Sequence, residues 1–244
     1  MNEKAIVYYL YHSGFAVKTK KHFLIFDYYN DKPDNGIRGL ENGVVSAKDL
    51  KKYDNVCVFV SHSHYDHFNP VIFQWSEENP KIRYFLSSDI PVREHKPNYH
   101  IMGPYQVFQE EDLKVKAYGS TDEGISFHVE VDGLYIFHAG DLNCWYWYYE
   151  STPQELEEDY QKFVVEIEKL KGEKIDIAFF PVDPRLKEYY YMGGEYFIKQ
   201  LKPKLFIPMH FGQQYSITRE FAHRVEGLPS RAAIIYKRGQ EIYI

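Results

Sequence analysis

The chain has 244 residues, of which 44% are hydrophobic and 26% charged, a composition typical of a globular protein with a sizeable core. Its 29 Lys and Arg residues are outnumbered by 35 Asp and Glu residues, and the net charge of −6 provides no general positive field for a nucleic-acid backbone. We therefore expect a single domain over residues 1–244 and do not expect nucleic acid as its partner.

The first residues do not resemble a targeting segment. The N-terminal sequence carries charges at Glu3 and Lys4, has only a short apolar run, and no later stretch has the length and hydropathy of a membrane span. Two cysteines, Cys57 and Cys144, are too few for a disulfide framework. We expect a cytoplasmic protein with no membrane partner.

Short apolar runs separated by turn residues predict strands. In chain order they cover residues 5–11, 22–27, 55–60, 83–86, 113–117, 125–131, 134–138, 175–181, 205–209 and 232–236. The dipeptide Asp132-Gly133 tolerates the positive φ of a tight turn, so it predicts a hairpin between the two runs on either side. An aromatic content of 18% also favours sheet structure.

The clearest helix signal is the sequence Thr152-Pro153-Gln154-Glu155. It offers an N-cap hydroxyl, a proline at the first helical position and a capping-box glutamate, and Gly172 ends the helical pattern. Further helices are predicted over 70–78, 186–201 and 218–226. Two batches of strands, each followed by helices, predict two sheets packed together with helices outside.

The strongest chemical signal is His62-Ser63-His64-Tyr65-Asp66-His67, which directly follows a predicted apolar strand. The odds of such a pattern arising by chance in this chain are on the order of one in a thousand. Residues i and i+2 of an extended segment project from one side, so His62 and His64 can share one cation. Asp66 and His67, after the chain turns, can face a second. Imidazoles packed this densely are electrostatically unfavourable without a metal, so the pattern predicts a metal site.

Such an ion usually takes at least three protein ligands, and the loop offers only two for each. Two further candidates follow predicted strands: Asp141 in His138-Ala139-Gly140-Asp141, and His210 in Pro208-Met209-His210-Phe211-Gly212. Each alone has an ordinary explanation, as a turn residue or as a satisfied polar group. Together with the first loop they predict the remaining ligands.

These motifs and their order resemble those of the metallo-β-lactamase fold hydrolases. The opening Tyr11-His12-Ser13-Gly14-Phe15, the later Leu24-Ile25-Phe26-Asp27 and Lys202-Pro203-Lys204 are similar to the branch that contains the ascorbate-6-phosphate lactonase. The resemblance covers about residues 5–215. It implies a four-layer αββα sandwich of the α/β (α+β) class, with the site along one edge of the packed sheets.

The resemblance also implies a role for each motif residue. The implied ligands are His62 and His64 for a first metal, Asp66, His67 and His210 for a second, and Asp141 as the bridge between them. Asp27 would orient the histidine loop from beneath the site. His12 would lie near the metals as a ligand or a supporting residue, with a strand-end histidine of no role as the equal alternative.

One ligand of the family pattern is missing. The family supplies a mid-chain histidine to the first metal, and the matching stretch, residues 118–124, contains none. The expected position falls at Thr121. Either Asp122 beside it ligates through oxygen, or the first site keeps only the ligands already named. An oxygen-richer site would favour Mn or Fe relative to Zn. His128 and His138 are weaker replacements because both lie inside predicted strands.

The implied cofactor is one or two divalent metal ions, with Zn first and Mn or Fe as alternatives. The implied reaction is hydrolysis of an ester, lactone, phosphoester or amide of a small molecule by a metal-activated water, with Asp66 orienting that water and accepting its proton. The predicted substrate-binding residues are Tyr65, Trp145, Asp183 and Arg185. A structural pair between Asp183 and Arg185 is the equal alternative to an anion clamp.

The sequence leaves two alternative functions. A non-catalytic metal-binding or ligand-sensing module on the same scaffold is motivated by the missing histidine. A metal-dependent nuclease is the enzymatic alternative, although the acidic balance counts against it. A redox role is weaker still, because His64 stands where diiron relatives typically carry a carboxylate. The natural substrate and the oligomeric state are not determined by the sequence.

Overall fold

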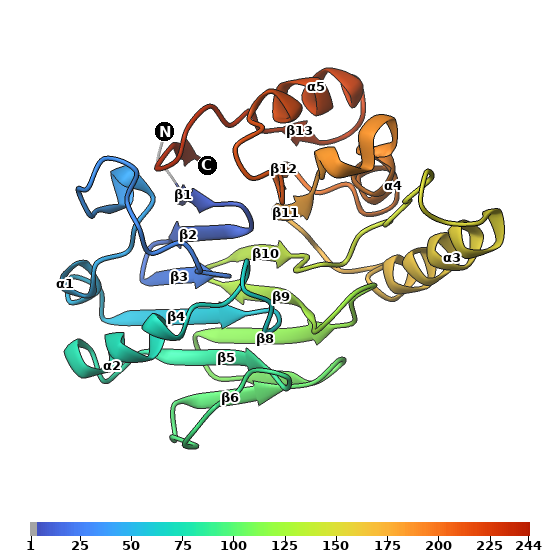
Figure 1. The fold of residues 1–244 in the computed structure, drawn as a ribbon. Helices are drawn as coiled ribbons and strands as arrows, with labels where there is room; N and C mark the ends of the chain where they lie inside the picture. Colours follow the sequence, from blue (N-terminus) through green and yellow to red (C-terminus); the bar gives the residue numbers. More distant parts are fainter. Residues whose placement is uncertain (1–3) are drawn as a thin grey trace. The chain divides into compact units, whose positions relative to one another are not determined.

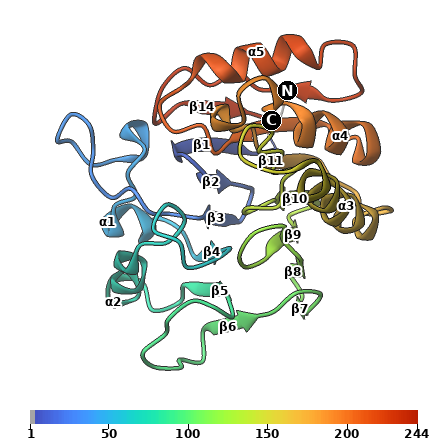
Figure 2. The ribbon, with the colours of Figure 1, turned by 45° about the vertical axis from the view of Figure 1, so that its right-hand side comes forward.

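The computed structural model describes residues 4–244, and the chain divides into two compact units. Unit 1 contains the residues up to Met102 together with Tyr236–Ile244, and unit 2 contains Gly103–Ile235. Each unit holds one seven-stranded sheet with both parallel and antiparallel pairs, accompanied by helices (Figures 1 and 2). The expected class, α+β with two sheets, is confirmed. The expectation of a single domain over 1–244 stays a prediction.

The sheet of unit 1 has the strand order β14-β1-β2-β3-β4-β5-β6. Strands β3 to β6 run parallel, and β14, β1, β2 and β3 form antiparallel pairs. The elements are β1 (Ile6–Tyr11), β2 (Gly14–Lys18), β3 (His22–Phe26), η1 (Leu40–Asn42), α1 (Ala47–Leu50), β4 (Asn55–Val60), η2 (Pro70–Gln74), α2 (Trp75–Glu78), β5 (Arg83–Ser87), β6 (Tyr99–Met102) and β14 (Glu241–Tyr243), where η marks a 3-10 helix.

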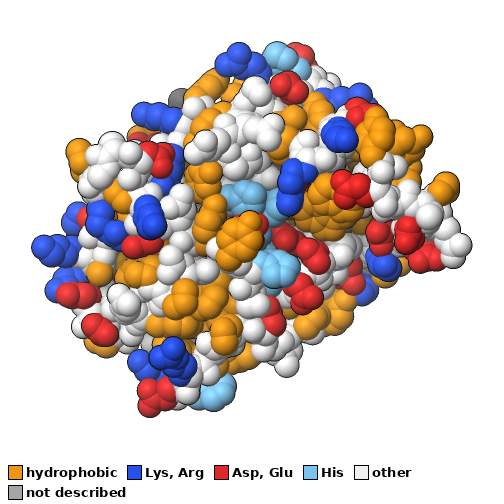
Figure 3. Space-filling model, in the orientation of Figure 1, with side chains coloured by type: hydrophobic (Ala, Val, Ile, Leu, Met, Phe, Trp, Pro, Cys, Tyr) orange, Lys and Arg blue, Asp and Glu red, His pale blue; other side chains and the backbone are white. Residues whose placement is uncertain are grey.

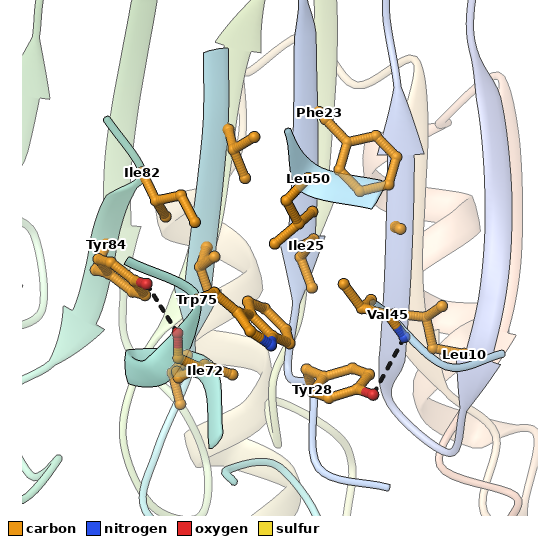
Figure 4. Close-up of a cluster of buried hydrophobic side chains, with 14 of the residues drawn as sticks. Leu10, Phe23, Ile25, Tyr28, Val45, Leu50, Ile72, Trp75, Ile82 and Tyr84 are labelled. Atoms are coloured by element: carbon orange, nitrogen blue, oxygen red, sulfur yellow. Dashed lines mark hydrogen bonds between the residues drawn. The ribbon is translucent and has the colours of Figure 1, made fainter. Parts of the chain in front are cut away.

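The helices α1 and α2 cover one face of this sheet, and a core of apolar side chains lies beneath them (Figure 4). Alternate residues of β3 such as Phe23 and Ile25 point into it, as a pleated strand requires. The buried hydroxyls are satisfied: Tyr84 donates to the carbonyl of Ile72 at 2.8 Å, and Tyr28 accepts the amide of Val45 at 3.2 Å. The intervening residues of these strands are buried too, so the strands read as continuous apolar runs in the sequence.

The sheet of unit 2 has the order β13-β12-β11-β10-β9-β8-β7, with β10 to β13 parallel. The elements are β7 (Val107–Gln109), β8 (Leu113–Tyr118), β9 (Ser126–Val131), β10 (Leu134–His138), α3 (Pro153–Lys169), β11 (Ile177–Pro181), η3 (Pro184–Tyr189), α4 (Met192–Leu201), β12 (Leu205–Met209), α5 (Ser216–Arg224) and β13 (Arg231–Ala232). Phenylalanine rings join the helices to the sheet: Phe180 of β11 lies 4.6 Å from Phe197 of α4, and Phe206 of β12 lies 4.8 Å from Phe221 of α5.

Two local predictions are confirmed in detail. Strands β9 and β10 form a hairpin, and both turn residues, Asp132 and Gly133, have positive φ. Helix α3 begins at Pro153 with a reciprocal capping box between Thr152 and Glu155. In both places the determining contacts lie within four residues, which is why sequence reasoning finds them.

Other boundaries differ from the predictions. The predicted helix over 186–201 is interrupted because Lys187 has φ 55° and ψ −128°, and α4 begins only at Met192. The predicted strand over 232–236 shrinks to β13, which pairs with β12 through Arg231 and Ala232 only. Strands β2, β6, β7 and β14 were not predicted, since they are short and depend on pairing with a neighbour.

On the face drawn in Figure 3, Lys and Arg side chains are interspersed with Asp and Glu rather than gathered in a basic stripe. The prediction that nucleic acid is not a partner stays a prediction. Among residues 4–244, no helix combines the length and the apolar character that crossing a bilayer would require.

Candidate metal centre

In unit 1 the candidate residues other than His12 follow the carboxyl ends of parallel strands. Asp27 follows β3, the His62–His67 loop follows β4, and Asp89 follows β5. Parallel strands end at the same edge of a sheet, so the topology gathers these side chains. The loop is fixed there in part by Asp89, whose Oδ2 accepts the amide of Ser63 at 2.7 Å.

Asp27 is fully buried and forms the hub of this cluster. Its Oδ1 accepts the Ser61 amide at 2.8 Å, and its Oδ2 accepts the Ser61 hydroxyl at 2.6 Å and meets His67 Nδ1 at 2.7 Å. Because the Ser61 hydroxyl donates to Asp27, its oxygen accepts from His62 Nδ1, 2.9 Å away. One carboxylate therefore sets the tautomer of two histidines, whose Nε2 atoms are the nitrogens left to act as ligands. This agrees with the supporting role that the family resemblance implies.

Two ligand groups form within unit 1. The ligand atoms of His12, Asp66 and His67 lie within 4.8 Å of one another, and so do those of His62 and His64. His12 Nε2 stands 3.5 Å from Asp66 Oδ2. Two ligands bound to one tetrahedral ion at about 2.1 Å are separated by about 3.4 Å, so this spacing suits a shared cation. The placement of His12 beside Asp66 favours the ligand role over a histidine with no role.

In unit 2, Asp141 follows β10, Asp183 follows β11 and His210 follows β12, again at the carboxyl ends of parallel strands. His210 Nε2 lies 3.3 Å from Asp141 Oδ1, close to the same ligand-to-ligand separation. Both side chains are buried, with 2% and 6% of their surfaces exposed. The donor set, imidazole nitrogen and carboxylate oxygen, suits Zn, Mn or Fe.

Asp183 contacts His210 at Nδ1, the ring nitrogen that does not face Asp141. Its Oδ2 meets His210 Nδ1 at 2.8 Å, and its carboxylate also accepts from Arg185 through Nε and Nη2, at 2.9 and 2.6 Å. Burial alone would raise the pKa of Asp183, yet these hydrogen bonds hold that pKa at about 2. The pair with Arg185, one of the two alternatives from the sequence, is present. The sequence analysis did not predict the contact between Asp183 and His210. The signal that could have pointed to it is the position of Asp183, an acid just after a parallel strand.

Three of the candidate residues have left-handed backbone conformations immediately after a strand: His12 (φ 56°), Asp27 (φ 42°) and His210 (φ 67°). Residues other than glycine seldom adopt positive φ, and the cost is tolerated mainly where the surroundings require it. Among residues 4–244, three of the seven non-glycine residues with positive φ are therefore candidate site residues.

Thr121 occupies the position where the family pattern has a histidine, and its side chain bonds to the backbone of a neighbouring loop. Thr121 Oγ1 accepts the amide of Asn143 at 2.9 Å and lies 2.6 Å from the carbonyl of the same residue, so it stabilises the loop that carries Asp141. Asp122 is exposed and, among residues 4–244, belongs to none of the His and Asp groups that could hold a metal. A ligand role for Asp122 stays a prediction.

The weaker candidates have ordinary structural surroundings. His128 is buried and contacts the carbonyl of Lys174 at 2.8 Å, and His138 is buried in β10. Tyr65 is 84% exposed. Trp145 is buried, donates from Nε1 to the carbonyl of Asp141 at 2.9 Å, and meets the His210 ring edge-on at 5.4 Å. The substrate-binding roles of Tyr65 and Trp145 stay predictions.

Comparison with known proteins shows the fold. No family model matches the sequence, and no curated protein is similar enough in sequence to match. Among solved structures, the chain is similar to Igni18, a novel metallo hydrolase from the hyperthermophilic archaeon Ignicoccus hospitalis, with a TM-score of 0.62, 17% identity and 98% of each chain covered. It is also similar to the metallo-β-lactamase fold protein YhfI from Bacillus subtilis, with a TM-score of 0.62, 12% identity and 99% and 100% of the two chains covered.

A more distant likeness is to CmlA, a diiron β-hydroxylase from Streptomyces venezuelae, with a TM-score of 0.55 and 9% identity. This chain is covered entirely and CmlA over 54% of its length. The chain thus has the metallo-β-lactamase fold, as its motifs led us to expect. Proteins of this fold include both metallo hydrolases and a diiron hydroxylase, so the reaction has to be argued from the site.

Proposed function

We propose that the protein is a metal-dependent hydrolase acting on an ester, lactone or phosphoester of a small molecule. The observation that carries the proposal is the gathering of histidine and aspartate ligands at the carboxyl ends of the parallel strands in each unit. The proposed ligands are His62, His64, Asp66, His67, Asp141 and His210, with His12 as a seventh. The proposed cofactor is one or two divalent ions, with Zn as the first choice and Mn or Fe as alternatives.

The residues fit a divalent metal on two grounds. Ligand atoms are spaced as they would be around one ion, at 3.5 Å for His12 and Asp66 and 3.3 Å for His210 and Asp141. In addition, His67 and His210 each turn Nδ1 towards a buried aspartate, which is the arrangement that presents Nε2 to a metal.

A divalent ion bound there would supply Lewis acidity, making water a nucleophile near neutral pH and polarising the bond under attack. In this proposal Asp66 orients the attacking water and accepts its proton, since its side chain is 23% exposed and within reach of solvent. Asp27 and Asp183 keep the histidines in one tautomer throughout. We also propose that Arg185 binds an anionic part of the substrate, and the 58% exposure of its side chain supports this role.

A non-catalytic metal-binding or sensing module is the second candidate, favoured because Thr121 bonds to Asn143 where the family pattern has a ligand. The small number of cysteines, two in 244 residues, supports the proposed cytoplasmic location, because secreted domains rely more often on disulfides.

Metal content and turnover together test the proposal. The protein purified without chelator is expected to contain one or two equivalents of Zn, Mn or Fe by mass spectrometry and to hydrolyse activated esters. Chelator is expected to abolish both, and His62→Ala is expected to abolish turnover and to lower the metal content. His223→Ala, at an exposed histidine of α5 that is not among the proposed ligands, is the matched control. Bound metal without turnover of any ester, lactone or phosphoester would favour the sensing module, and absence of metal binding would overturn both.

A further inference from the structure

A pocket of about 560 Å³ lies within unit 1, and none of the proposed metal ligands lines it. Its volume is in the range of roughly 300–1,000 Å³ that is usual for small-molecule sites. The pocket is lined by Phe68, Pro70, Phe73, Pro91, Val92, Arg93, Glu94, Lys96 and Tyr99.

The walls of the pocket are continuous with the histidine loop. Phe68 directly follows His67, and its amide donates to the carbonyl of His64 at 3.0 Å. A second wall, within residues 91–96, follows Asp89 in the chain, and Asp89 accepts the amide of Ser63 at 2.7 Å. Both walls are therefore anchored on the segment that carries the proposed ligands, and a molecule in the pocket contacts the residue next to one of them.

The interior of the pocket is aromatic. The rings of Phe68 and Phe73 are 5.9 Å apart, and those of Phe73 and Tyr99 are 5.3 Å apart. At these separations, rings interact edge-on or offset with one another and with a flat group placed between them. Val92 adds an aliphatic side chain, so this part of the lining suits a flat, apolar group.

The rim of the pocket is charged and unbalanced. Its charged lining residues are two cations, Arg93 and Lys96, and one acid, Glu94, and all three residues are exposed. The chain as a whole carries a net charge of −6, so this excess of positive charge is local to the pocket. Exposed cations beside an aromatic cavity favour a ligand that joins an apolar body to an anionic group.

We propose that this pocket binds the flat, apolar part of an anionic small molecule, with Arg93 and Lys96 facing its charged group. Resting on the proposed hydrolase function, we assign this chemistry to the substrate of that reaction. The substrate is then an ester, lactone or phosphoester with a ring or similar flat apolar portion and one carboxylate, sulfonate or phosphate group.

A pair of fluorescent probes tests the pocket without any turnover. Anilinonaphthalene sulfonate combines a flat aromatic body with one anion, and phenylnaphthylamine is the same body without the charge. We expect the sulfonate to bind the purified holoenzyme at a single saturable site. The double variant Arg93→Glu, Lys96→Glu is expected to weaken sulfonate binding by about tenfold and to leave phenylnaphthylamine binding nearly unchanged.

Two further variants locate the site. Val92→Trp should fill the cavity and abolish binding of both probes, and Phe73→Ala should weaken both by about three- to tenfold through loss of one ring contact. The matched control Lys18→Glu, Lys20→Glu removes two exposed cations elsewhere in unit 1 and is expected to change neither affinity. Circular dichroism of each variant checks that the fold is retained.

The outcomes separate this inference from the proposed function. Absence of saturable binding, or binding that is insensitive to both Val92→Trp and Phe73→Ala, would overturn the pocket whether or not the protein hydrolyses esters. Competitive inhibition of ester hydrolysis by the sulfonate probe would support the substrate class. Binding without any effect on measured hydrolysis would overturn that assignment.

Discussion

Asp183 and His210 are joined by a buried hydrogen bond of 2.8 Å between Oδ2 and Nδ1. The same arrangement occurs in unit 1, where Asp27 Oδ2 meets Nδ1 of His67 at 2.7 Å. In each unit, then, an aspartate at the end of one parallel strand orients a histidine that follows the neighbouring strand. Neither pair is close in sequence.

We expect Asp183→Asn to weaken metal binding by about 10- to 100-fold, because the amide no longer fixes the tautomer of His210. Competition with a chromogenic chelator measures the affinity. Asp176→Asn is the matched control, since Asp176 is also buried in unit 2 and paired with Lys204 at 2.6 Å but lies at the opposite end of its strand. Equal losses of metal affinity in the two variants would contradict the positioning role.

Thr121→His is expected to restore the ligand that the family pattern places here. We expect this variant to bind metal about tenfold more tightly than Thr121→Val, which removes the hydroxyl that bonds to Asn143 without adding a ligand. Titration with Zn, followed by mass spectrometry, gives both stoichiometry and affinity. Binding no tighter in the histidine variant would show that this position does not face the metal.

Glu173 should contribute to the acid sensitivity of unit 2. Its Oε1 accepts hydrogen bonds from Lys116 at 2.5 Å and from Tyr118 at 2.6 Å. Partial burial acts to raise the pKa of Glu173, but these bonds outweigh it and lower the pKa below the ordinary value of 4.5. A lowered pKa stabilises the fold above the unfolded value, and this stability is lost as pH falls through the folded value.

We therefore expect Glu173→Gln to be less stable than the wild type near neutral pH, with a difference that shrinks as the pH falls below about 4.5. Urea midpoints measured from about pH 6 to pH 3 show this convergence. Glu168→Gln, at an exposed pair with Lys171, is the control and is expected to change little. A constant gap between Glu173→Gln and the wild type across this range would refute the linkage.

Arg238 is a structural residue that sequence reasoning missed. It is only 6% exposed, and its guanidinium donates to the carbonyls of Leu10 at 2.6 Å and Lys32 at 2.6 Å and to that of Gly43 at 3.1 Å. It thereby ties the loop between β3 and α1 to β1. Arg238→Met leaves these buried carbonyls without a donor, and we expect a loss of about 3 kcal/mol in the free energy of unfolding.

The exposed neighbour Lys237 supplies the comparison, because Lys237→Met should change the same quantity by less than about 0.5 kcal/mol. Urea denaturation at neutral pH measures both variants. Equal stabilities of the two variants would mean that the loop is held by other contacts.

The sequence by itself determined the elements whose causes are local. The hairpin at Asp132-Gly133 and the capping box at Thr152 depend on contacts within a few residues, and both occur as predicted. The His62–His67 motif could also be recognised as a candidate metal site, because metal ligands are particular residue types at close spacing. These features also led to the expected fold.

The tertiary structure decided what depends on pairing between distant segments. Strand β14 exists because it pairs with β1, and the break at Lys187 shortens a helix that periodicity alone would extend. The contacts of Asp183 with His210 and of Thr121 with Asn143 span 27 and 22 residues, and they arise because strand ends and loops meet at one sheet edge. A single sequence states which residues can ligate, but parallel strand order determines which aspartate holds which histidine.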